Sequence, residues 1–402
     1  MNKINETLNG NVEKKRFNMI FSCIAVLYPA IALYWSGISS LSVADILLLG
    51  CVLKFLMDVI SAKDIRVNIP WFLFLLFLFL HMVLIAVFYN RQLELFTFLR
   101  YALYIFAVSI LAPNYFEPLF ALKILKVSGI AIAIFSIVQA VGIYVFGYYL
   151  KGYLSFFPIM RDELTKYGVN YLSGVLRVRG VFGEPSHLAA YLTLALTVVL
   201  FTNTIYKYLW SIVICVALVF SVSTTAFILM AFIWIYYFYK KLRYSKTISL
   251  TKILSFFLLV VTLGIIIVLF LKSNLYATLF RRITIENSYS GRMDSYDIFI
   301  NNDFSVIEKI FGHGYIDSDT YLASYPLTFW RYGYCGLLGI VLTMFYLYKG
   351  KSILQKTLLI VFLVLCSGTM SLYSYMLIPY MAFICCDSTV VIDKEEFRYV
   401  QK

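Results

Sequence analysis

Long apolar runs recur from one end of this 402-residue chain to the other, and they constrain its fold more than any other feature. The runs are roughly 15 to 24 residues long, close to the length that an α-helix needs to cross the hydrocarbon core of a bilayer. Only 14% of the residues are charged and 62% are hydrophobic, too little polar surface for a water-soluble globule. The alternating segments of a membrane-spanning β-barrel are missing from the sequence. The sequence therefore predicts an all-α polytopic membrane protein with a single integral-membrane domain, 1–402.

The apolar runs predict about twelve transmembrane helices. The predicted spans are 18–36, 43–60, 69–88, 95–112, 124–147, 186–203, 208–221, 224–239, 253–271, 326–348, 356–371 and 373–386. Several are short, and tilted pairs or re-entrant segments among them would lower the number to ten or eleven. The first run follows a polar, basic tail and has no convincing signal-peptidase site, which predicts an uncleaved signal anchor.

The basic residues indicate how the chain is oriented. Much of the net charge of +13 lies in short connections between spans, and not in one stripe of the kind that binds nucleic acid. The positive-inside rule places in the cytoplasm the tail at 14–16, the connections near 63–66, 123–126, 240–246 and 349–351, and the C-terminal tail. Both termini are then cytoplasmic, and two large loops, 148–185 and 272–325, lie on the outer side.

These outer loops carry arginines that the positive-inside rule would deplete there. They are Arg161, Arg177 and Arg179 in the first loop, and Arg281, Arg282 and Arg292 in the second. An anionic ligand would explain them, because guanidinium groups bind phosphates through paired hydrogen bonds. Ion pairs with nearby carboxylates, such as Asp162 and Asp294, are the alternative explanation.

The sharpest local feature is the segment RVRGVFGEPSHLAAY at 177–191. Gly180 permits a tight turn, Pro185 suits the first turn of a helix, and Glu184 is stabilised by the dipole at a helix N-terminus. This pattern is typical of an ordinary helix start. It also brings two arginines, a carboxylate and His187 together at the membrane surface, an arrangement suited to phosphoryl or glycosyl transfer.

The second outer loop contains candidate groups for proton transfer. His313 stands between two glycines in FGHGY, which predicts an exposed turn where a histidine titrates near neutrality. A lone loop histidine usually has no chemical role, which is the alternative. Asp317 and Asp319 follow as a pair of carboxylates or as simple turn residues.

Some charged or polar residues lie within predicted spans, where each needs a partner or a polar cavity. An uncompensated charge at Arg100 would cost at least about 2.5 to 3.5 kcal/mol, so we expect this side chain to face the bundle interior or a cavity. Lys54 and Asp58 are four residues apart and should neutralise each other. We expect His81 to be a hydrogen-bonded core histidine.

The seven cysteines form no CxxC pair, so we expect free thiols and no metal site.

Together these features resemble the Wzy-type O-antigen and capsular polysaccharide polymerases, which form one superfamily with the O-antigen ligases. The resemblance covers most of the chain. It rests on the many spans with an enlarged penultimate outer loop, the RxRGxFxEPSxxA stretch at 177–189, the small polar break SVSTTA at 221–226, and the GRxxxY and FGxGY patterns within 291–315.

The resemblance implies a GT-C-like fold and a membrane glycosyltransferase of the bacterial inner membrane. Such an enzyme polymerises undecaprenyl-pyrophosphate-linked oligosaccharide repeat units on the periplasmic face and needs no cofactor. Its expected partners are these lipid-linked oligosaccharides, the bilayer and a chain-length regulator of the same pathway. The residues that we expect to bind pyrophosphate or glycan are Arg177, Arg179, Arg281, Arg292 and Arg100. Glu184 is the first candidate for the catalytic base, followed by Asp319 and His313.

One departure from the superfamily affects this assignment. The ligases usually carry a His-Asn pair shortly before the helix that follows the large loop, whereas this chain has DSDTYL at 317–322. The departure favours a polymerase over an O-antigen ligase and leaves the acid and base open. A lipid-linked oligosaccharide flippase or another transporter is the second alternative, although the chain shows no duplicated halves with broken helices.

Overall fold

A computed structural model describes residues 2–38, 41–61, 64–89, 94–160, 171–172, 175–243, 290–300, 304–315 and 321–386. Over these ranges the chain is almost entirely helical, which confirms the predicted helical class. The exception is a small antiparallel pair of two-residue strands, β1 (Tyr171–Leu172) and β2 (Val175–Leu176).

Helices occupy every predicted span except 253–271, which lies outside the described residues. The first are α1 (Asn2–Ile31), α2 (Val43–Ile60), α3 (Ile69–Tyr89), α4 (Leu95–Phe106), the π-helix η1 (Ala107–Leu111), α5 (Ala112–Tyr115) and α6 (Pro118–Phe146). The later ones are α8 (Pro185–Phe201), α9 (Lys207–Phe220), α10 (Thr224–Arg243), α13 (Ser290–Asp297), α14 (Val306–Phe311), α15 (Ser324–Tyr348), α16 (Ile353–Gly368), the 3₁₀ turn η2 (Ser371–Tyr373) and α17 (Leu377–Cys385).

Three of the described helical stretches are long and apolar enough to cross a membrane by length and composition. They are Ile69–Val87, Leu95–Tyr115 and Pro118–Phe146. The shorter apolar helices are Pro185–Phe201, Lys207–Phe220 and Ile353–Gly368. The structure therefore supports a helical membrane protein, while the number of twelve spans stays a prediction.

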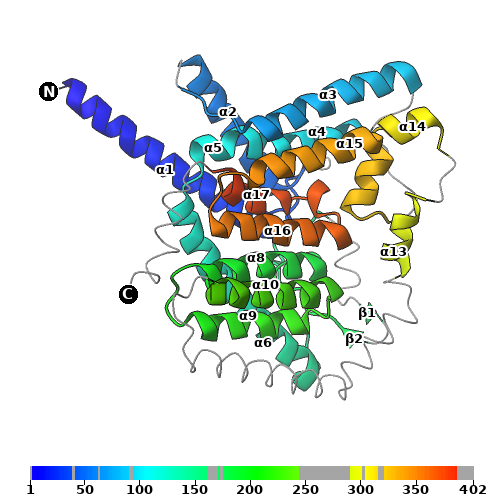
Figure 1. Cartoon of the computed structure of the whole chain (residues 1–402). Coiled ribbons are helices and arrows are strands. Elements are labelled where there is room, and N and C mark those ends of the chain that lie inside the picture. Colours follow the sequence, from blue (N-terminus) through cyan, green and yellow to red (C-terminus); the bar gives the residue numbers. More distant parts are fainter. Residues whose placement is uncertain are drawn as a thin grey trace.

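The helices stack in layers with their axes running mostly in one direction (Figure 1). α3, α4 and α15 form the upper layer of this view, α16 and α17 the middle, and α8, α9 and α10 the lower part, with α6 crossing behind them. α8 packs against α6, α9, α10 and α16, and nearly all of its side chains are buried. Because protein surrounds α8, its 17 residues need little contact with lipid.

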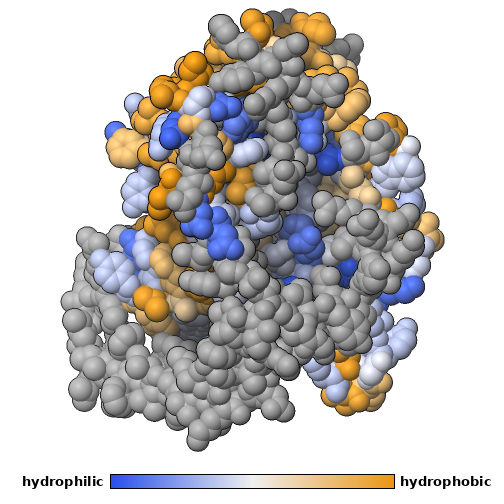
Figure 2. All heavy atoms as spheres, turned by 90° about the vertical axis from the view of Figure 1, so that its right-hand side faces the viewer, coloured by the Kyte–Doolittle hydropathy of each residue, from blue (hydrophilic) through white to orange (hydrophobic). Residues whose placement is uncertain are grey.

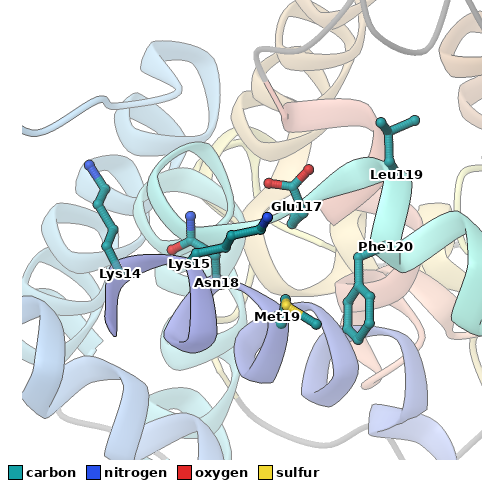
Figure 3. A pocket seen from close by; sticks show the side chains of 7 residues that line it. All are labelled: Lys14, Lys15, Asn18, Met19, Glu117, Leu119 and Phe120. Carbon is teal, nitrogen blue, oxygen red and sulfur yellow. The ribbon is translucent and has the colours of Figure 1, made fainter. Parts of the chain in front are cut away.

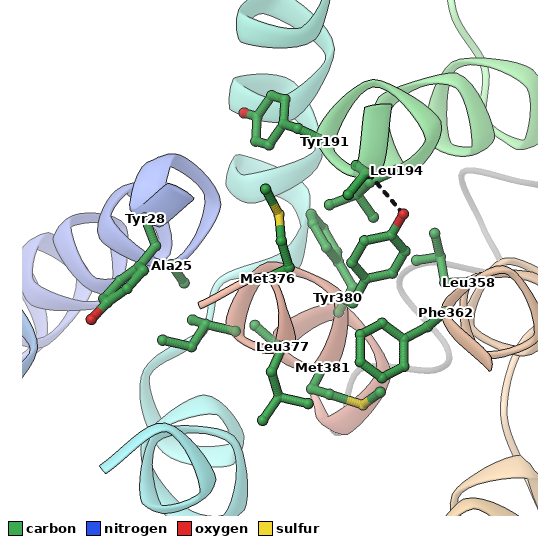
Figure 4. Close-up of a cluster of buried hydrophobic side chains, with 14 of the residues drawn as sticks. Ala25, Tyr28, Tyr191, Leu194, Leu358, Phe362, Met376, Leu377, Tyr380 and Met381 are labelled. Carbon is green, nitrogen blue, oxygen red and sulfur yellow. Dashed lines mark hydrogen bonds between the residues drawn. The ribbon is translucent and has the colours of Figure 1, made fainter. Parts of the chain in front are cut away.

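The predicted span 373–386 differs most from the structure. The chain there forms η2 and then α17, a helix of nine residues that is buried throughout its length. Figure 4 shows Tyr380 and Met381 of α17 among side chains of α8 and α16. The Gln355 amide, in the first turn of α16, donates to the carbonyls of Phe383, Ile384 and Cys386, so α17 ends level with the start of α16. A helix this short is tolerated because protein satisfies its last carbonyls.

Two predictions about polar residues inside spans are confirmed. Lys54 donates to Asp58 Oδ1, and the Tyr115 hydroxyl donates to Asp58 Oδ2 at 2.8 Å. His81 is buried, and its Nε2 is hydrogen-bonded to the Phe311 carbonyl. Each group therefore has a partner inside the bundle, as low-dielectric surroundings require.

Candidate functional site

One end of the bundle, on the right of Figure 1, gathers α13, α14, the β1–β2 pair and the segment before α8. We call this end the loop face and define it by the described residues of 147–160, 171–187, 290–315 and 367–376. Figure 2 looks onto it and shows hydrophilic side chains near its middle, between hydrophobic flanks. Most of the predicted site residues whose side chains are described lie at or just beneath this face.

Arg177 anchors the segment before α8 to the break between α9 and α10. Its side chain is only 8% exposed, and its Nε donates to the Ser221 carbonyl at 3.4 Å. Val222 beside it has a φ of +47°, a conformation that marks a sharp break for a β-branched residue. The structure thus brings together the RxRGxF and SVSTTA motifs, which the sequence places 44 residues apart.

Arg179 is also buried, with 5% of the residue exposed. Its Nε donates to the Tyr149 hydroxyl at 2.7 Å, and its Nη1 donates to the Gly183 carbonyl at 3.5 Å. Its guanidinium carbon lies 5.8 Å from the centre of the Tyr149 ring and 5.7 Å from that of Tyr153, within cation–π range. Gln139 Oε1 accepts from the Arg179 backbone N–H at 3.2 Å and fixes the main chain. The guanidinium therefore has a fixed position.

These contacts of Arg179 are with neutral groups. Burial raises the pKa of Tyr149 above its ordinary value, and the nearby Arg179 charge only partly opposes this effect. The phenol therefore stays protonated at neutral pH, and the Tyr149 hydroxyl adds no negative charge beside the Arg179 guanidinium. A fixed cation flanked by aromatic rings can bind a phosphate and, beside it, the face of a sugar ring.

Glu184 and His187 follow at the start of α8. Glu184 is the N-cap residue, half-buried, with an extended φ of −139°, and its carboxylate accepts from the Ser186 hydroxyl at 3.0 Å. His187 Nδ1 is hydrogen-bonded to the Tyr375 hydroxyl at 2.7 Å. The predicted helix start is confirmed, and Tyr375 is a neighbour that the sequence alone did not indicate.

The exposed turn predicted at His313 is wrong. The side chain is 7% exposed, with its ring 4.4 Å from that of Trp330 and 4.5 Å from that of Phe304. His313 Nδ1 lies 3.4 Å from Glu308 Oε1. The two flanking glycines do form a turn, but the turn folds onto α15 instead of facing solution.

A crossing of two glycine backbones explains this burial. α15 is kinked at Gly333, whose φ is 60° and ψ −156°, and Gly312 has a φ of 73° and a ψ of −168°. A Cβ on Gly312 would lie 2.4 Å from the carbonyl carbon of Arg331, and one on Gly333 would lie 2.4 Å from that of Ile310. The His313 N–H donates across the crossing to the Trp330 carbonyl at 2.8 Å. The segment after α14 is thereby locked against the kink.

Arg331 is a third buried guanidinium that sequence analysis missed. It is 3% exposed, and its guanidinium carbon lies 3.8 Å from the centre of the Tyr315 ring and 5.2 Å from that of Tyr373. The hydroxyls of Tyr101 and Tyr332 nearby are buried and have no hydrogen-bond partner in the described part of the chain. A charge inside a predicted span was the available signal, as it was for Arg100.

Arg100 faces the bundle interior, as predicted. Its Nε lies 3.4 Å from Asp45 Oδ2, and Asp45 is fully buried. The Asp45 carboxylate also accepts from the Tyr28 hydroxyl at 2.6 Å and from the Tyr104 hydroxyl at 3.2 Å. This internal ion pair gives Arg100 a structural role that does not require substrate.

Several predicted site residues are not placed by the structure. Arg161, Arg281, Arg282, Asp317 and Asp319 lie outside the described residues. Arg292 belongs to α13, but its side chain is not described. Within the described ranges, no group of three or more His, Cys, Asp or Glu side chains is arranged to hold a metal ion.

Comparison with known proteins identifies no relative. No protein-family model matches the chain, and no curated protein and no solved structure is significantly similar to it.

Proposed function

We propose that this chain is a membrane glycosyltransferase that polymerises lipid-linked oligosaccharide repeat units into O-antigen or capsular polysaccharide. Its donor would be an undecaprenyl-pyrophosphate-linked glycan, and the reaction would take place on the periplasmic face of the bacterial inner membrane. The observation that carries the proposal is Arg179, a buried guanidinium within cation–π range of two tyrosine rings at the loop face. The motif resemblance supplies the class of substrate and the GT-C-like fold with about twelve spans.

The proposed reaction requires two things of the protein: positive charge that stabilises the leaving group, and one base that accepts a proton from the acceptor hydroxyl. The bond between the anomeric carbon of the growing glycan and its pyrophosphate breaks, and a hydroxyl oxygen of the next repeat unit bonds to that carbon. Lipid pyrophosphate leaves with additional negative charge, which Arg179 and Arg177 would stabilise. Because the charge rests on fixed guanidinium groups, stabilisation costs little reorganisation.

Glu184 is the best-placed base among the described candidates. It is half-buried, and its backbone follows Gly183, whose carbonyl accepts from Arg179. The acceptor's hydroxyl proton would pass to its carboxylate as the new glycosidic bond forms. The buried ring of His313 is a less suitable base, since Trp330 and Phe304 cover it.

The test is to delete the gene in its host and resolve the surface polysaccharide on a gel. Single repeat units without a ladder are expected from a strain that lacks the polymerase. Rescue with wild type should restore the ladder, whereas Arg179→Ala should fail and Arg179→Lys should restore it only weakly, because lysine keeps the charge but loses the planar donors. Arg66→Ala, which alters an exposed arginine at the other end of the bundle, is the matched control and should rescue fully.

The same gels separate the alternatives. Long undecaprenyl-linked chains that never reach a final acceptor would identify an O-antigen ligase. Absence of repeat units from the periplasm would identify a flippase or another transporter. Full rescue by both Arg177→Ala and Arg179→Ala would refute the site while leaving the function standing. All variants are compared at equal membrane levels, measured with a terminal tag.

A further inference from the structure

A pocket of about 450 Å³ opens at the end of the bundle opposite to the loop face. It lies between α1 and the start of α6 (Figure 3). The α1 side contributes Lys14, Lys15 and Met19, and the α6 side contributes Glu117, Leu119 and Phe120. None of these residues belongs to the proposed glycosyltransferase site, so the pocket has a separate explanation.

The elements that line the pocket indicate that it lies at a membrane–water boundary. α6 is among the helices long and apolar enough to cross a bilayer, and its first turn forms one wall. On the other wall, the exposed Lys14 and Lys15 immediately precede the apolar stretch of α1. Basic residues directly outside a transmembrane helix are typical contacts of phospholipid headgroups.

The lining has a polar side and an apolar side. Lys15 extends toward the carboxylate of Glu117, Asn18 lies near Lys15 on α1, and Met19 and Phe120 lie below them (Figure 3). The N-terminus of α6 adds partial positive charge, since Glu117 makes no side-chain cap to its first N–H groups. The pocket therefore offers two ammonium groups, an amide, a helix N-terminus, a single carboxylate and an apolar wall.

We propose that this pocket binds the headgroup of a phospholipid of the surrounding bilayer. Lys14 and Lys15, the Asn18 amide and the α6 N-terminus take the phosphate, and the apolar wall takes the start of an acyl chain. The Glu117 carboxylate accepts a hydrogen bond from a hydroxyl or ammonium group at the far end of the headgroup. Phosphatidylglycerol and phosphatidylethanolamine carry such donors, whereas the trimethylated amine of phosphatidylcholine does not.

Native mass spectrometry of the full chain in mild detergent tests this proposal. Defined phosphatidylglycerol, phosphatidylethanolamine and phosphatidylcholine are titrated separately, and the bound fraction gives an apparent Kd. The first two lipids should bind several-fold more tightly than phosphatidylcholine. Lys15→Gln should weaken phosphatidylglycerol binding by about tenfold, as expected for loss of a charge-assisted contact. Lys349→Gln, which alters an exposed lysine outside the pocket, is the matched control and should change nothing.

Glu117→Ala tests separately whether the Glu117 carboxylate recognises the far end of the headgroup. It should reduce the preference for phosphatidylglycerol over phosphatidylcholine while retaining phosphate binding. Lys14→Gln replaces Lys15→Gln if size-exclusion chromatography shows that the latter does not fold. Binding of inorganic phosphate with no binding of phospholipid would overturn the lipid assignment. Equal affinities for all three lipids, unchanged by the Lys15 and Glu117 variants, would overturn the site.

Discussion

Arg100 and Arg331 show two ways in which a cation is accommodated inside this bundle. Arg100 has a carboxylate partner, Asp45, whereas Arg331 lies against the rings of Tyr315 and Tyr373. A buried ion pair offsets its own desolvation only with good geometry and further hydrogen bonds, and the tyrosine hydroxyls around Asp45 supply these. The Tyr315 and Tyr373 rings stabilise the Arg331 charge through cation–π contacts, which are stronger when the rings are desolvated.

His313 allows a prediction that separates packing from catalysis. His313→Ala removes contacts with two aromatic rings, each worth about 0.5 to 1.5 kcal/mol, while His313→Phe keeps the ring. We expect His313→Phe to retain most of the thermal stability and the polysaccharide ladder, and His313→Ala to lower the melting midpoint. The checks are unfolding in detergent followed by size-exclusion chromatography, and the rescue gel.

A catalytic histidine would give a different pattern. His313→Phe and His313→Ala would then abolish the ladder equally, although the phenylalanine variant melted like wild type. Glu308 keeps its bonds to the Ser305 backbone N–H and hydroxyl in both variants, so loss of that capping contact does not confuse the comparison.

Local spacing decided which of these residue contacts the sequence could predict. Lys54 and Asp58 are four apart on one helix, and their ion pair followed from helix geometry alone. The partner of Arg100 comes from a different helix, 55 positions away, and no spacing rule connects the two. The burial of His313 was mispredicted because glycine neighbours also permit a close backbone crossing.

At the scale of elements, the kink of α15 and the segment after α14 form one unit. Gly312 and Gly333 both have φ and ψ values that are essentially confined to glycine. Their backbones also approach too closely for any Cβ. The crossing holds His313 and Arg331 next to each other's backbones and keeps both side chains buried. It therefore determines the structure of this part of the loop face.

Alanine substitution at these glycines should therefore prevent folding of the loop face. Gly333→Ala combines backbone strain with a clash against Ile310, and we expect a loss of several kcal/mol, with little folded protein recovered from membranes. Gly350→Ala is the matched control, because φ there is +67° but no atom lies within 4 Å of the added Cβ. It should cost only about 1 to 2 kcal/mol. Equal melting midpoints for the two variants would contradict the crossing.

The positions of the helices were largely predictable, because most predicted spans were apolar runs long enough to form a helix across the bilayer. The start of α8 could also be predicted, since Pro185 and Glu184 favour a first turn independently of the rest of the fold. The kink of α15 and the shortness of α17 depend on neighbouring elements. The length of the apolar runs in the sequence indicates neither of these two features.

For the whole molecule, the layered bundle presents the loop face at one end and the lysine-lined pocket at the other (Figure 1). The positive-inside rule predicts which of these ends faces the cytoplasm. Two exposed positions suit a direct check. Phe156 is 75% exposed at the loop face, and Lys349 is exposed in the connection between α15 and α16 at the opposite end.

Labelling of introduced cysteines tests this orientation. In a background with the seven native cysteines replaced, Phe156→Cys should react with a membrane-impermeant maleimide in cells whose outer membrane has been opened. Lys349→Cys should react only after the inner membrane is permeabilised. The reverse pattern would invert the topology and place the arginines of the loop face in the cytoplasm, where a periplasmic reaction could not use them.

The burial of α17 also has a consequence for biogenesis. A segment of nine residues that packs against α1, α5, η1 and α16 is too short to span the bilayer by itself as it leaves the translocon. It can dock only after its neighbours have assembled, and among the described helices it is the last to be synthesised. Completion of this bundle is therefore a post-insertion event, and a chain that stops short of α17 would leave an open apolar groove for quality-control proteases to recognise.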